Sequence, residues 1–325
     1  MKRFFLVLAA IGFIGSIEAQ QVDFSVVSVP EESGLNITRI SSDNDCIVLP
    51  AVIRKKNGVT WLSNRIVRVT PDGESIAYLA KRNGMTNIFV KNLDKQGSAI
   101  QRTNRQEVLD FSYSPDGKVM CFSEHRGAEY QIFQTDAVNG YVCRQITSGS
   151  LDFSPVFSSN QSQIFFARQE NKSQSIWSFD VKSKFLSSYS SGMNPCPLKG
   201  EPAYLCTRIG PNGRGEIWKV NYETNSDECI VSDINRGFSS PVVSPDGKWI
   251  LLVGESIIDL PKKKYYNTDL YVCRIDGTQL TQLTFHAADD LSPVWSKDGK
   301  SIYFISQRGS ATATANIWKM DFVVF

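Results

Sequence analysis

The chain has 325 residues, of which 42% are hydrophobic, 21% charged and 11% aromatic, and its formal charge at pH 7 is +2. This composition excludes a disordered tail, a collagen-like fibre and a small disulfide-stapled domain. The near-neutral balance provides no electrostatic footprint for nucleic acid or for an acidic membrane surface, so we expect neither as a partner. The aromatic content favours β-structure.

The first 19 residues have the pattern of a secretory signal peptide. Lys2 and Arg3 form a basic start, residues 4–14 are apolar, and Ala19 is a small residue suited to precede cleavage. The apolar run is shorter than the about 20 residues that span a bilayer, and no later run reaches that length. The first cysteine is Cys46, so no lipoprotein cysteine stands at the cleavage point. We expect residues 20–325 to be a soluble chain, periplasmic or secreted, without a transmembrane segment.

Seven cysteines in an exported chain raise the question of disulfides. Their number is odd and their spacing irregular, and Cys121 and Cys206 lie inside apolar, strand-like runs. We therefore expect most of them to be small buried hydrophobic residues, with one bridge as an open alternative. There is no Cys-x-x-Cys pair, so we expect no cysteine-based metal site.

A short turn motif recurs along the whole chain. Its copies read Pro-Asp-Gly or Lys-Asp-Gly at 71–73, 115–117, 245–247 and 297–299, and degraded copies stand at Asn160 and at Lys199-Gly200. The mean spacing of about 45 residues is that of β-propeller blades. Proline sets φ at the first corner, aspartate bonds the backbone and glycine accepts positive φ, so each copy predicts a hairpin.

Two apolar patterns recur at similar distances after each turn, and we call each set of equivalent positions a column. After each turn comes a strand such as Ile76-Ala77-Tyr78 or Ile164-Phe165-Phe166. A branched aliphatic residue beside an aromatic one then follows at 88–89, 132–133, 176–177, 217–218, 270–271 and 317–318. Continuous apolar runs suit strands that are covered on both faces. The Ser-Pro pieces at 154–158 and 292–296 are then expected to be innermost strands.

These patterns predict an all-β fold, a single six-bladed β-propeller with four antiparallel strands per blade. The expected blades are approximately 61–104, 105–147, 148–190, 191–233, 234–285 and 286–321, the last completed by residues 35–41. The last repeat ends at Asp321 with only three strands, and the missing strand is found at Asn36–Ser41. We expect this N-terminal strand to close the ring, because closure removes exposed sheet edges.

The Ser-Pro-Asp-Gly-Lys pieces at 114–118 and 244–248, together with Leu283–His286 and Trp295-Ser296, resemble the WD-like propeller repeats of TolB and its relatives. The resemblance covers residues 35–41 and 61–321 and implies the propeller fold. Its repeat serves many unrelated functions, so it implies no particular activity. TolB itself carries a further N-terminal α/β domain, whereas here only about 40 residues lie between the expected signal peptide and the first blade.

Two classes of enzyme contain a propeller of this kind. Prolyl-oligopeptidase enzymes add an α/β-hydrolase domain, but this sequence has no Gly-x-Ser-x-Gly elbow and only two histidines. Oligogalacturonate lyases hold a divalent metal through several histidines, and the cluster His286, Asp289 and Asp290 is a candidate contributor here. The alternative function is therefore a metal-assisted polyuronide lyase or hydrolase acting at the propeller mouth.

Arginines gather in the connections between the second and third strands of the blades, and acidic residues such as Asp152 stand in the inter-blade loops on the same face. Solvated charges and Arg–Asp ties between blades are one interpretation. The other is a funnel that binds a carboxylate, a sugar acid or a peptide terminus. The candidate ligand-binding residues are Arg82, Arg126, Arg208, Arg308, His286, Asp290 and Tyr265.

Tyr265 belongs to a basic–aromatic insertion, and residues 42–64 form a second irregular insertion. Loops on rigid scaffolds are where binding specificity resides. The sequence therefore predicts a non-catalytic binding or scaffolding module for an envelope protein or peptide segment, or for a cell-surface or dietary glycan. We expect no catalytic residues, no cofactor and a monomer, with a metal only in the alternative.

Overall fold

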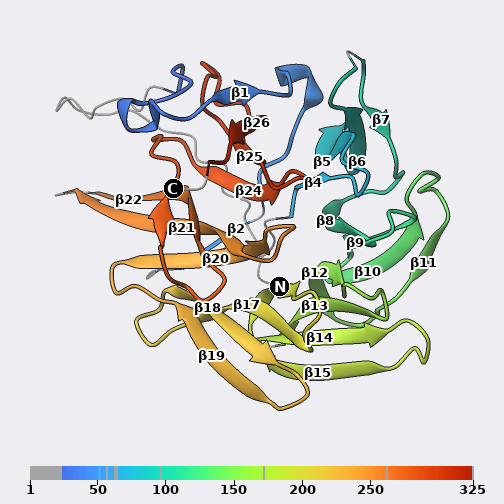
Figure 1. Cartoon of the computed structure of the whole chain (residues 1–325). Helices are drawn as coiled ribbons and strands as arrows, with labels where there is room; N and C mark the ends of the chain where they lie inside the picture. The colour runs from blue at the N-terminus through green and yellow to red at the C-terminus, as the bar shows by residue number, and fades with distance from the viewer. Residues whose placement is uncertain are drawn as a thin grey trace.

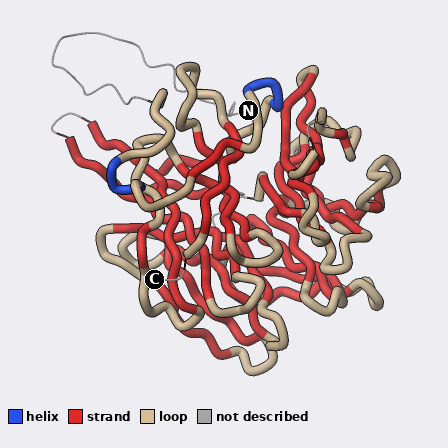
Figure 2. The backbone as a smooth tube through the Cα atoms, turned by 45° about the horizontal axis from the view of Figure 1, so that its top comes forward, coloured by secondary structure: helices blue, strands red, loops and turns tan. Residues whose placement is uncertain are grey.

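The computed structural model describes residues 24–50, 52–55, 58–61, 65–95, 97–170, 173–260 and 263–323. For 52–55, 58–61, 256–260 and 263–266 it describes the backbone alone. These residues form strands β1 to β26 and two short 3-10 helices, η1 (Pro30–Glu32) and η2 (Asp43–Asp45), and no α-helix (Figure 2). The expected all-β class is confirmed. The signal-peptide residues 1–19 lie outside the described residues.

The strands form successive antiparallel meanders. The first sheet comprises β4 (Val67–Val69), β5 (Ser75–Arg82), β6 (Met85–Asn92) and β7 (Ile100–Gln101). An eight-stranded sheet contains β8 (Val108–Tyr113), β9 (Val119–Arg126), β10 (Glu129–Asp136), β11 (Cys143–Gln145), β12 (Leu151–Phe157), β13 (Gln163–Glu170), β14 (Ser173–Asp180) and β15 (Leu186–Ser191). Its two halves, β8–β11 and β12–β15, are joined by one parallel pair, Tyr130 with Leu151.

The remaining sheets follow the same order. One sheet comprises β16 (Met193–Pro197), β17 (Ala203–Ile209), β18 (Gly215–Asn221) and β19 (Ser226–Val231). The next comprises β20 (Arg236–Val243), β21 (Trp249–Leu260), β22 (Lys263–Arg274) and β23 (Thr281–Gln282). The last comprises β24 (Asp290–Trp295), β25 (Ser301–Ser306), β26 (Asn316–Asp321) and β1 (Ile37–Arg39). A separate hairpin pairs β2 (Val52–Lys55) with β3 (Gly58–Trp61). Figure 1 shows the meanders arranged around a centre, with β4, β8, β12, β20 and β24 inside and β7, β11, β15 and β19 at the rim.

This arrangement gives the molecule two faces. We call the face with the Pro-Asp-Gly hairpins and the connections between third and fourth strands the turn face. The face with the second-to-third-strand hairpins and the connections between sheets is the loop face. The alternating strand direction places these two sets of connections at opposite ends of each sheet.

The predicted turns have a common hydrogen-bond arrangement. In the second copy, Ser114 Oγ donates to Asp116 Oδ1 at 2.7 Å, and the Lys118 N–H donates to the same oxygen at 3.1 Å. Gly117 has φ +74°, which a residue with a side chain rarely adopts. The same serine or threonine to aspartate bond occurs at Asp72, Asp246 and Asp298.

The aliphatic–aromatic column lies in the core between sheets. Its aliphatic members Ile88, Ile132, Ile176, Ile217, Leu270 and Ile317 are all fully buried. Each strand is covered on both faces by neighbouring sheets, so burial follows the column and not simple alternation. The seven cysteines are all free thiols. Cys121 and Cys206 are buried, as the apolar runs around them predicted, and so is Cys273. The expectation that most of the seven are buried is wrong, because the other four are half-buried or exposed: Cys143, Cys196, Cys46 and Cys229. No helix within the described ranges is long and apolar enough to cross a membrane.

The innermost strands contain a feature that the repeat pattern did not predict. Ser154, Asn194, Ser240 and Ser292 each precede a proline and have φ between +52° and +57°. Each lies where its strand slips register against the next, which is a β-bulge. The bulges link neighbouring four-stranded meanders: the Ser154 N–H donates to Asp110 Oδ2 at 2.7 Å, and Ser292 Oγ accepts from the Ile66 and Val67 N–H groups.

The N-terminal strand pairs with the last sheet, as predicted. Ile37 is opposite Met320 and Arg39 opposite Trp318. The contact continues beyond the strand, where Ser41 Oγ accepts from the Ile317 N–H at 2.8 Å and donates to Asn316 Oδ1 at 2.9 Å. Chain segments almost three hundred residues apart are therefore joined by buried hydrogen bonds.

Replacing Ser41 with alanine should lower the free energy of unfolding by about 1–3 kcal/mol, because it leaves the buried Ile317 N–H without its acceptor. The matched control is Asn36→Ala on the same segment, whose bond to Asp321 is exposed and should matter by less than about 0.5 kcal/mol. Urea unfolding measures both. Equal effects of the two variants would show that closure does not depend on this buried contact.

Candidate functional site

The structure places several of the predicted ligand-binding arginines against aromatic rings of their own sheets. The Arg82 guanidinium lies 4.3 Å from the Phe89 ring centroid, and that of Arg208 lies 4.8 Å from the Trp218 centroid. Arg208 also pairs with Asp227 at 2.6 Å. In both cases the ring is the aromatic member of the aliphatic–aromatic column. These arginines therefore brace the second strand against the third.

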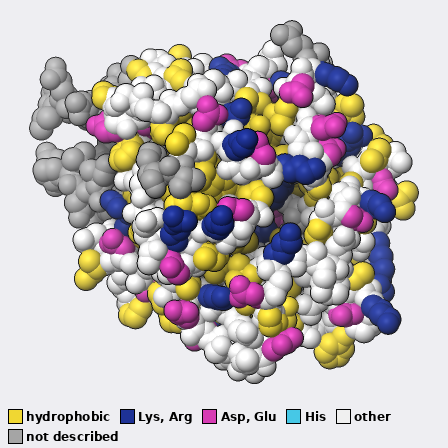
Figure 3. All heavy atoms as spheres, viewed as in Figure 1, with side chains coloured by type: hydrophobic (Ala, Val, Ile, Leu, Met, Phe, Trp, Pro, Cys, Tyr) yellow, Lys and Arg dark blue, Asp and Glu magenta, His cyan; other side chains and the backbone are white. Residues whose placement is uncertain are grey.

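Arg308 and Asp290 occupy the interior. Both side chains are 0% exposed, with Arg308 Nη2 2.5 Å from Asp290 Oδ2. Arg308 also makes a bidentate pair with Glu32, at 2.9 and 3.1 Å. This placement corrects the expectation of a ligand-facing pair, because the N-terminal segment around η1 covers both groups. Figure 3 shows how basic and acidic side chains intermix around the middle of one view.

His286 is also buried, with 1% of its surface exposed, and its Nδ1 accepts the Ala288 N–H at 2.9 Å. It lies between β23 and β24, whereas the other histidine, His125, lies on β9. Within the part of the chain that the structure describes, no three His, Cys, Asp or Glu side chains converge as metal ligands would. The Tyr265 side chain lies outside the described residues, and its backbone in β22 pairs with Ile258.

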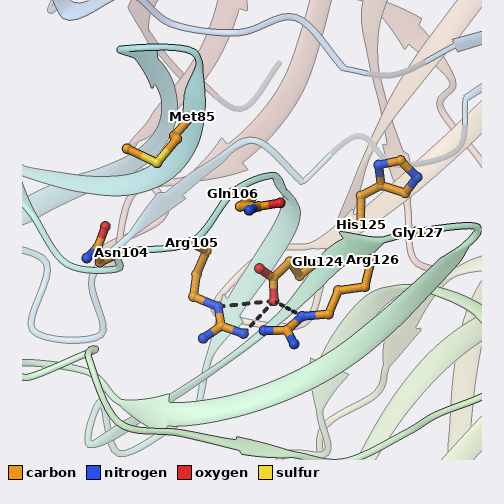
Figure 4. A pocket seen from close by; sticks show the side chains of 8 residues that line it. All are labelled: Met85, Asn104, Arg105, Gln106, Glu124, His125, Arg126 and Gly127. Atoms are coloured by element: carbon orange, nitrogen blue, oxygen red, sulfur yellow. Dashed lines mark hydrogen bonds and ion pairs between the residues drawn. The ribbon is translucent and has the colours of Figure 1, made fainter.

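Arg126, the remaining predicted residue, lines a pocket of about 410 Å³ on the loop face, between the first sheet and β9. Its walls are Met85, Asn104, Arg105, Gln106, Glu124, His125, Arg126 and Gly127. Figure 4 shows Arg105 and Arg126 converging on Glu124 from two different elements. Arg105 comes from the connection between β7 and β8, and Arg126 from the end of β9.

Both guanidinium groups share one carboxylate oxygen. Glu124 Oε2 accepts from Arg105 Nε at 3.1 Å, from Arg105 Nη2 at 2.6 Å and from Arg126 Nε at 3.1 Å. The Glu124 side chain is 3% exposed, whereas that of Arg126 is 49% exposed. Both arginines also lie over the Phe133 ring, at 4.9 and 5.1 Å. The three charged groups sum to one excess positive charge.

The excess charge faces solvent. The terminal nitrogens of Arg126 donate to no acceptor among the residues that the structure describes, and the amide side chains of Asn104 and Gln106 likewise form no hydrogen bond there. His125 stacks on Tyr130 with ring centroids 5.0 Å apart, and its Nδ1 lies 2.9 Å from Glu107 Oε2. The pocket thus combines free cationic donors with neutral amides, a set that suits a carboxylate.

Arg105 and Glu124 were missed by the sequence reasoning. Arg105 stands in the connection between β7 and β8, and Glu124 lies in β9. One available signal was the pair Glu124 and Arg126 at alternate positions of one strand, which places both side chains on the same face.

The fold and this pocket define a β-propeller with a cationic recess on its loop face. Residues 52–197 match the family described as the TolB beta-propeller domain, so the chain is similar to TolB-type β-propellers. No curated protein matches the chain.

Solved structures with similar folds include TolB-type proteins and a lyase. A TolB-type protein from Agrobacterium tumefaciens aligns with TM-score 0.61 and 16% identity over 89% of this chain and 98% of its own. TolB from Acinetobacter baumannii aligns with TM-score 0.58 and 16% identity over 77% of this chain and 64% of its own. Oligogalacturonate lyase from Vibrio parahaemolyticus aligns with TM-score 0.57 and 14% identity over 88% of this chain and 93% of its own. At these identities the similarity concerns the fold alone.

Proposed function

We propose that this chain is an exported, non-catalytic six-bladed propeller that binds an acidic segment of another protein at its loop face. The observation that carries the proposal is the free guanidinium end of Arg126 beside Arg105, with a single carboxylate, Glu124, between them. Two cations that share one buried carboxylate leave a local positive charge. A ligand carboxylate would neutralise it through charge-assisted hydrogen bonds.

The blade count is part of this proposal. Four separate four-stranded sheets support it, together with an eight-stranded sheet whose two halves are each a four-stranded meander. The export of residues 20–325 and their location in the periplasm or outside the cell rest on the signal-peptide pattern.

A protein segment is favoured over a glycan by the composition of the pocket walls. Sugars are commonly held by stacking on aromatic faces, and the wall set contains no Phe, Tyr or Trp. The metal-assisted lyase alternative gains no support from the two histidines, because His125 lies on β9 and His286 is enclosed in the connection between β23 and β24.

The test compares two capped peptides, acetyl-Gly-Glu-Gly-amide and its glutamine counterpart, by titration calorimetry. The glutamate peptide should bind about tenfold or more tightly than the glutamine peptide, and Arg126→Ala should remove that preference, since a hydrogen bond to a charged group contributes about 1.5–3 kcal/mol. The matched control is Arg144→Ala, an exposed arginine of β11 outside the pocket, which should bind as the wild type does.

An unchanged affinity for the glutamate peptide in Arg126→Ala would contradict the proposal. If trigalacturonate binds more tightly than the glutamate peptide and this binding depends on Arg126, the ligand of the pocket is a uronate glycan and not a protein segment. High ionic strength should weaken binding in either case, because the guanidinium is half exposed.

A further inference from the structure

We propose that the centre of the propeller binds a small monocarboxylate, such as acetate or formate, on the guanidinium group of Arg68 and close to that of Arg65. Both arginines come from the innermost part of the first sheet, since Arg68 lies in β4 and Arg65 two residues before that strand. The site is separate from the loop-face pocket and does not depend on the proposed function.

Arg65 crosses the middle of the molecule. Its Nη2 donates to the Pro195 carbonyl in β16, the innermost strand of the fourth meander. Figure 1 shows the first meander, which contains β4, and the fourth, which contains β17 to β19, on opposite sides of the centre. The Arg65 side chain therefore spans the space around which the sheets are arranged. A spanning side chain favours a small ligand over a segment of another protein at this depth.

Arg68 has donors that the described residues do not use. Its Nη1 donates to the Val67 carbonyl at 2.9 Å, whereas its Nε and Nη2 donate to no acceptor within the described ranges. The side chain is half-buried, and neither of these two nitrogens is sealed from solvent. A ligand that enters from solvent can therefore reach them. The parallel Nε–H and Nη2–H bonds of a guanidinium match the two oxygens of a carboxylate.

The charges around Arg68 leave one excess positive charge. The charged groups that act on it most strongly are the Arg65 guanidinium and the Asp110 carboxylate of β8. Asp110 serves a different contact, because its Oδ1 accepts from Ser123 Oγ and its Oδ2 accepts from the Ser154 N–H at 2.7 Å. Two guanidinium groups and one carboxylate therefore sum to a single positive charge at the centre.

Nearby thiols do not balance that charge. Cys121 and Cys196 lie close to both arginines, but burial raises the pKa of each thiol, so both are neutral at pH 7. Burial, together with the charge of Arg65, lowers the pKa of Arg68 to about 9, which shows that its charged form is disfavoured in the folded protein. A bound monocarboxylate would make the site neutral, whereas a phosphate dianion would leave an excess negative charge there.

The first experiment follows the backbone amide resonances of Val67 and Arg68 in the full chain during titration with sodium acetate at pH 7. Sodium chloride keeps the ionic strength constant. Both resonances should shift saturably, and inorganic phosphate should bind about fivefold or more weakly than acetate. Arg68→Gln should abolish the saturable shift of Val67. The matched control Arg144→Gln, on exposed β11, and the loop-face variant Arg126→Ala should both bind acetate at the centre as the wild type does.

The second experiment compares melting temperatures. Without acetate, Arg68→Gln should melt about 2 °C or more above the wild type, because the substitution removes a buried cation that lacks a counter-charge. Acetate should raise the melting temperature of the wild type and of Arg144→Gln, but not that of Arg68→Gln.

A role of Arg68 in the fold alone would give the opposite pattern, with Arg68→Gln melting below the wild type and acetate without effect on either protein. That pattern would overturn the proposal. The absence of saturable shifts at Val67 and Arg68, or phosphate binding that is tighter than acetate binding, would overturn it as well.

Discussion

Replacing Arg308 with alanine should lower the free energy of unfolding by about 3–5 kcal/mol, the largest effect expected from a single substitution in this protein. Arg308 is fully buried and lies between Glu32 and Asp290, both of which are also buried. Its removal leaves two enclosed carboxylates without a counter-charge. The residue also donates to the Val27 carbonyl, so the substitution frees the N-terminal segment from the last sheet.

Urea unfolding followed by tryptophan fluorescence measures this effect, with Arg144→Ala as the control because Arg144 is exposed. Adding Glu32→Gln to Arg308→Ala should recover part of the loss, since one of the unpaired charges disappears. Such non-additivity is expected only for residues in direct contact. A loss for Arg308→Ala within about 0.5 kcal/mol of the control would mean that solvent reaches the cluster and that the charges are not truly buried.

Asp269→Asn should stabilise the protein at pH 8 by at least about 2 kcal/mol and remove a pH dependence that the wild type shows. Burial raises the pKa of Asp269 to about 8, and the nearby charges of Asp290 and Glu32 add to the effect. Asn267 and Gln282 both donate to its Oδ2 at 3.2 Å, whereas its Oδ1 is enclosed and has no partner in the described residues. An asparagine at this position removes the charge and keeps the shape.

The direction in which stability changes with pH follows from proton binding. Between the unfolded pKa of Asp269, near 3.9, and its folded pKa of about 8, the folded state binds more protons than the unfolded state, so stability falls as the pH rises. Burial also raises the pKa of Asp290, to about 6, which adds to the same fall at lower pH. The wild type should therefore lose stability from pH 5 to pH 8, and Asp269→Asn should flatten that curve.

The control is Asp276→Asn, on the turn between β22 and β23. Hydrogen bonds from Thr278 lower the pKa of this exposed carboxyl, so it is ionised throughout the range from pH 5 to pH 8. Asp276→Asn should therefore leave the slope of stability against pH unchanged. Thermal unfolding at several pH values measures all three proteins. Parallel curves for the wild type and Asp269→Asn would show that Asp269 is ionised in the folded state at neutral pH.

Repetition explains why so much of the fold could be predicted. Each Pro-Asp-Gly turn needs only its own residues to form, since Asp116 is bonded by Ser114 and Lys118. The aliphatic–aromatic column recurs because every sheet is covered by a neighbour on each face. Even the pairing of Ile37–Arg39 with β26 followed from counting strands in the last repeat.

The candidate site could be predicted only in part, because a repeat does not say which charges meet. Arg82, Arg126, Arg208 and Arg308 occupy comparable positions in the repeat, so the sequence predicts the same role for all four. They differ in their neighbours: Arg82 lies over Phe89, whereas Arg308 is enclosed by Glu32 from the distant N-terminal segment. Arg126 remains available because the buried Glu124 is shared with Arg105, which comes from the connection between β7 and β8.

The sequence by itself therefore determined the elements, the turns and the ring closure of this protein, because these depend on local backbone chemistry and on a periodic apolar pattern. Only the tertiary structure decided which polar groups are buried, paired or left free. The cost of a buried charge and the strength of an ion pair depend on atoms brought together from distant parts of the chain. The loop-face pocket lined by Arg105, Glu124 and Arg126 is set by those contacts.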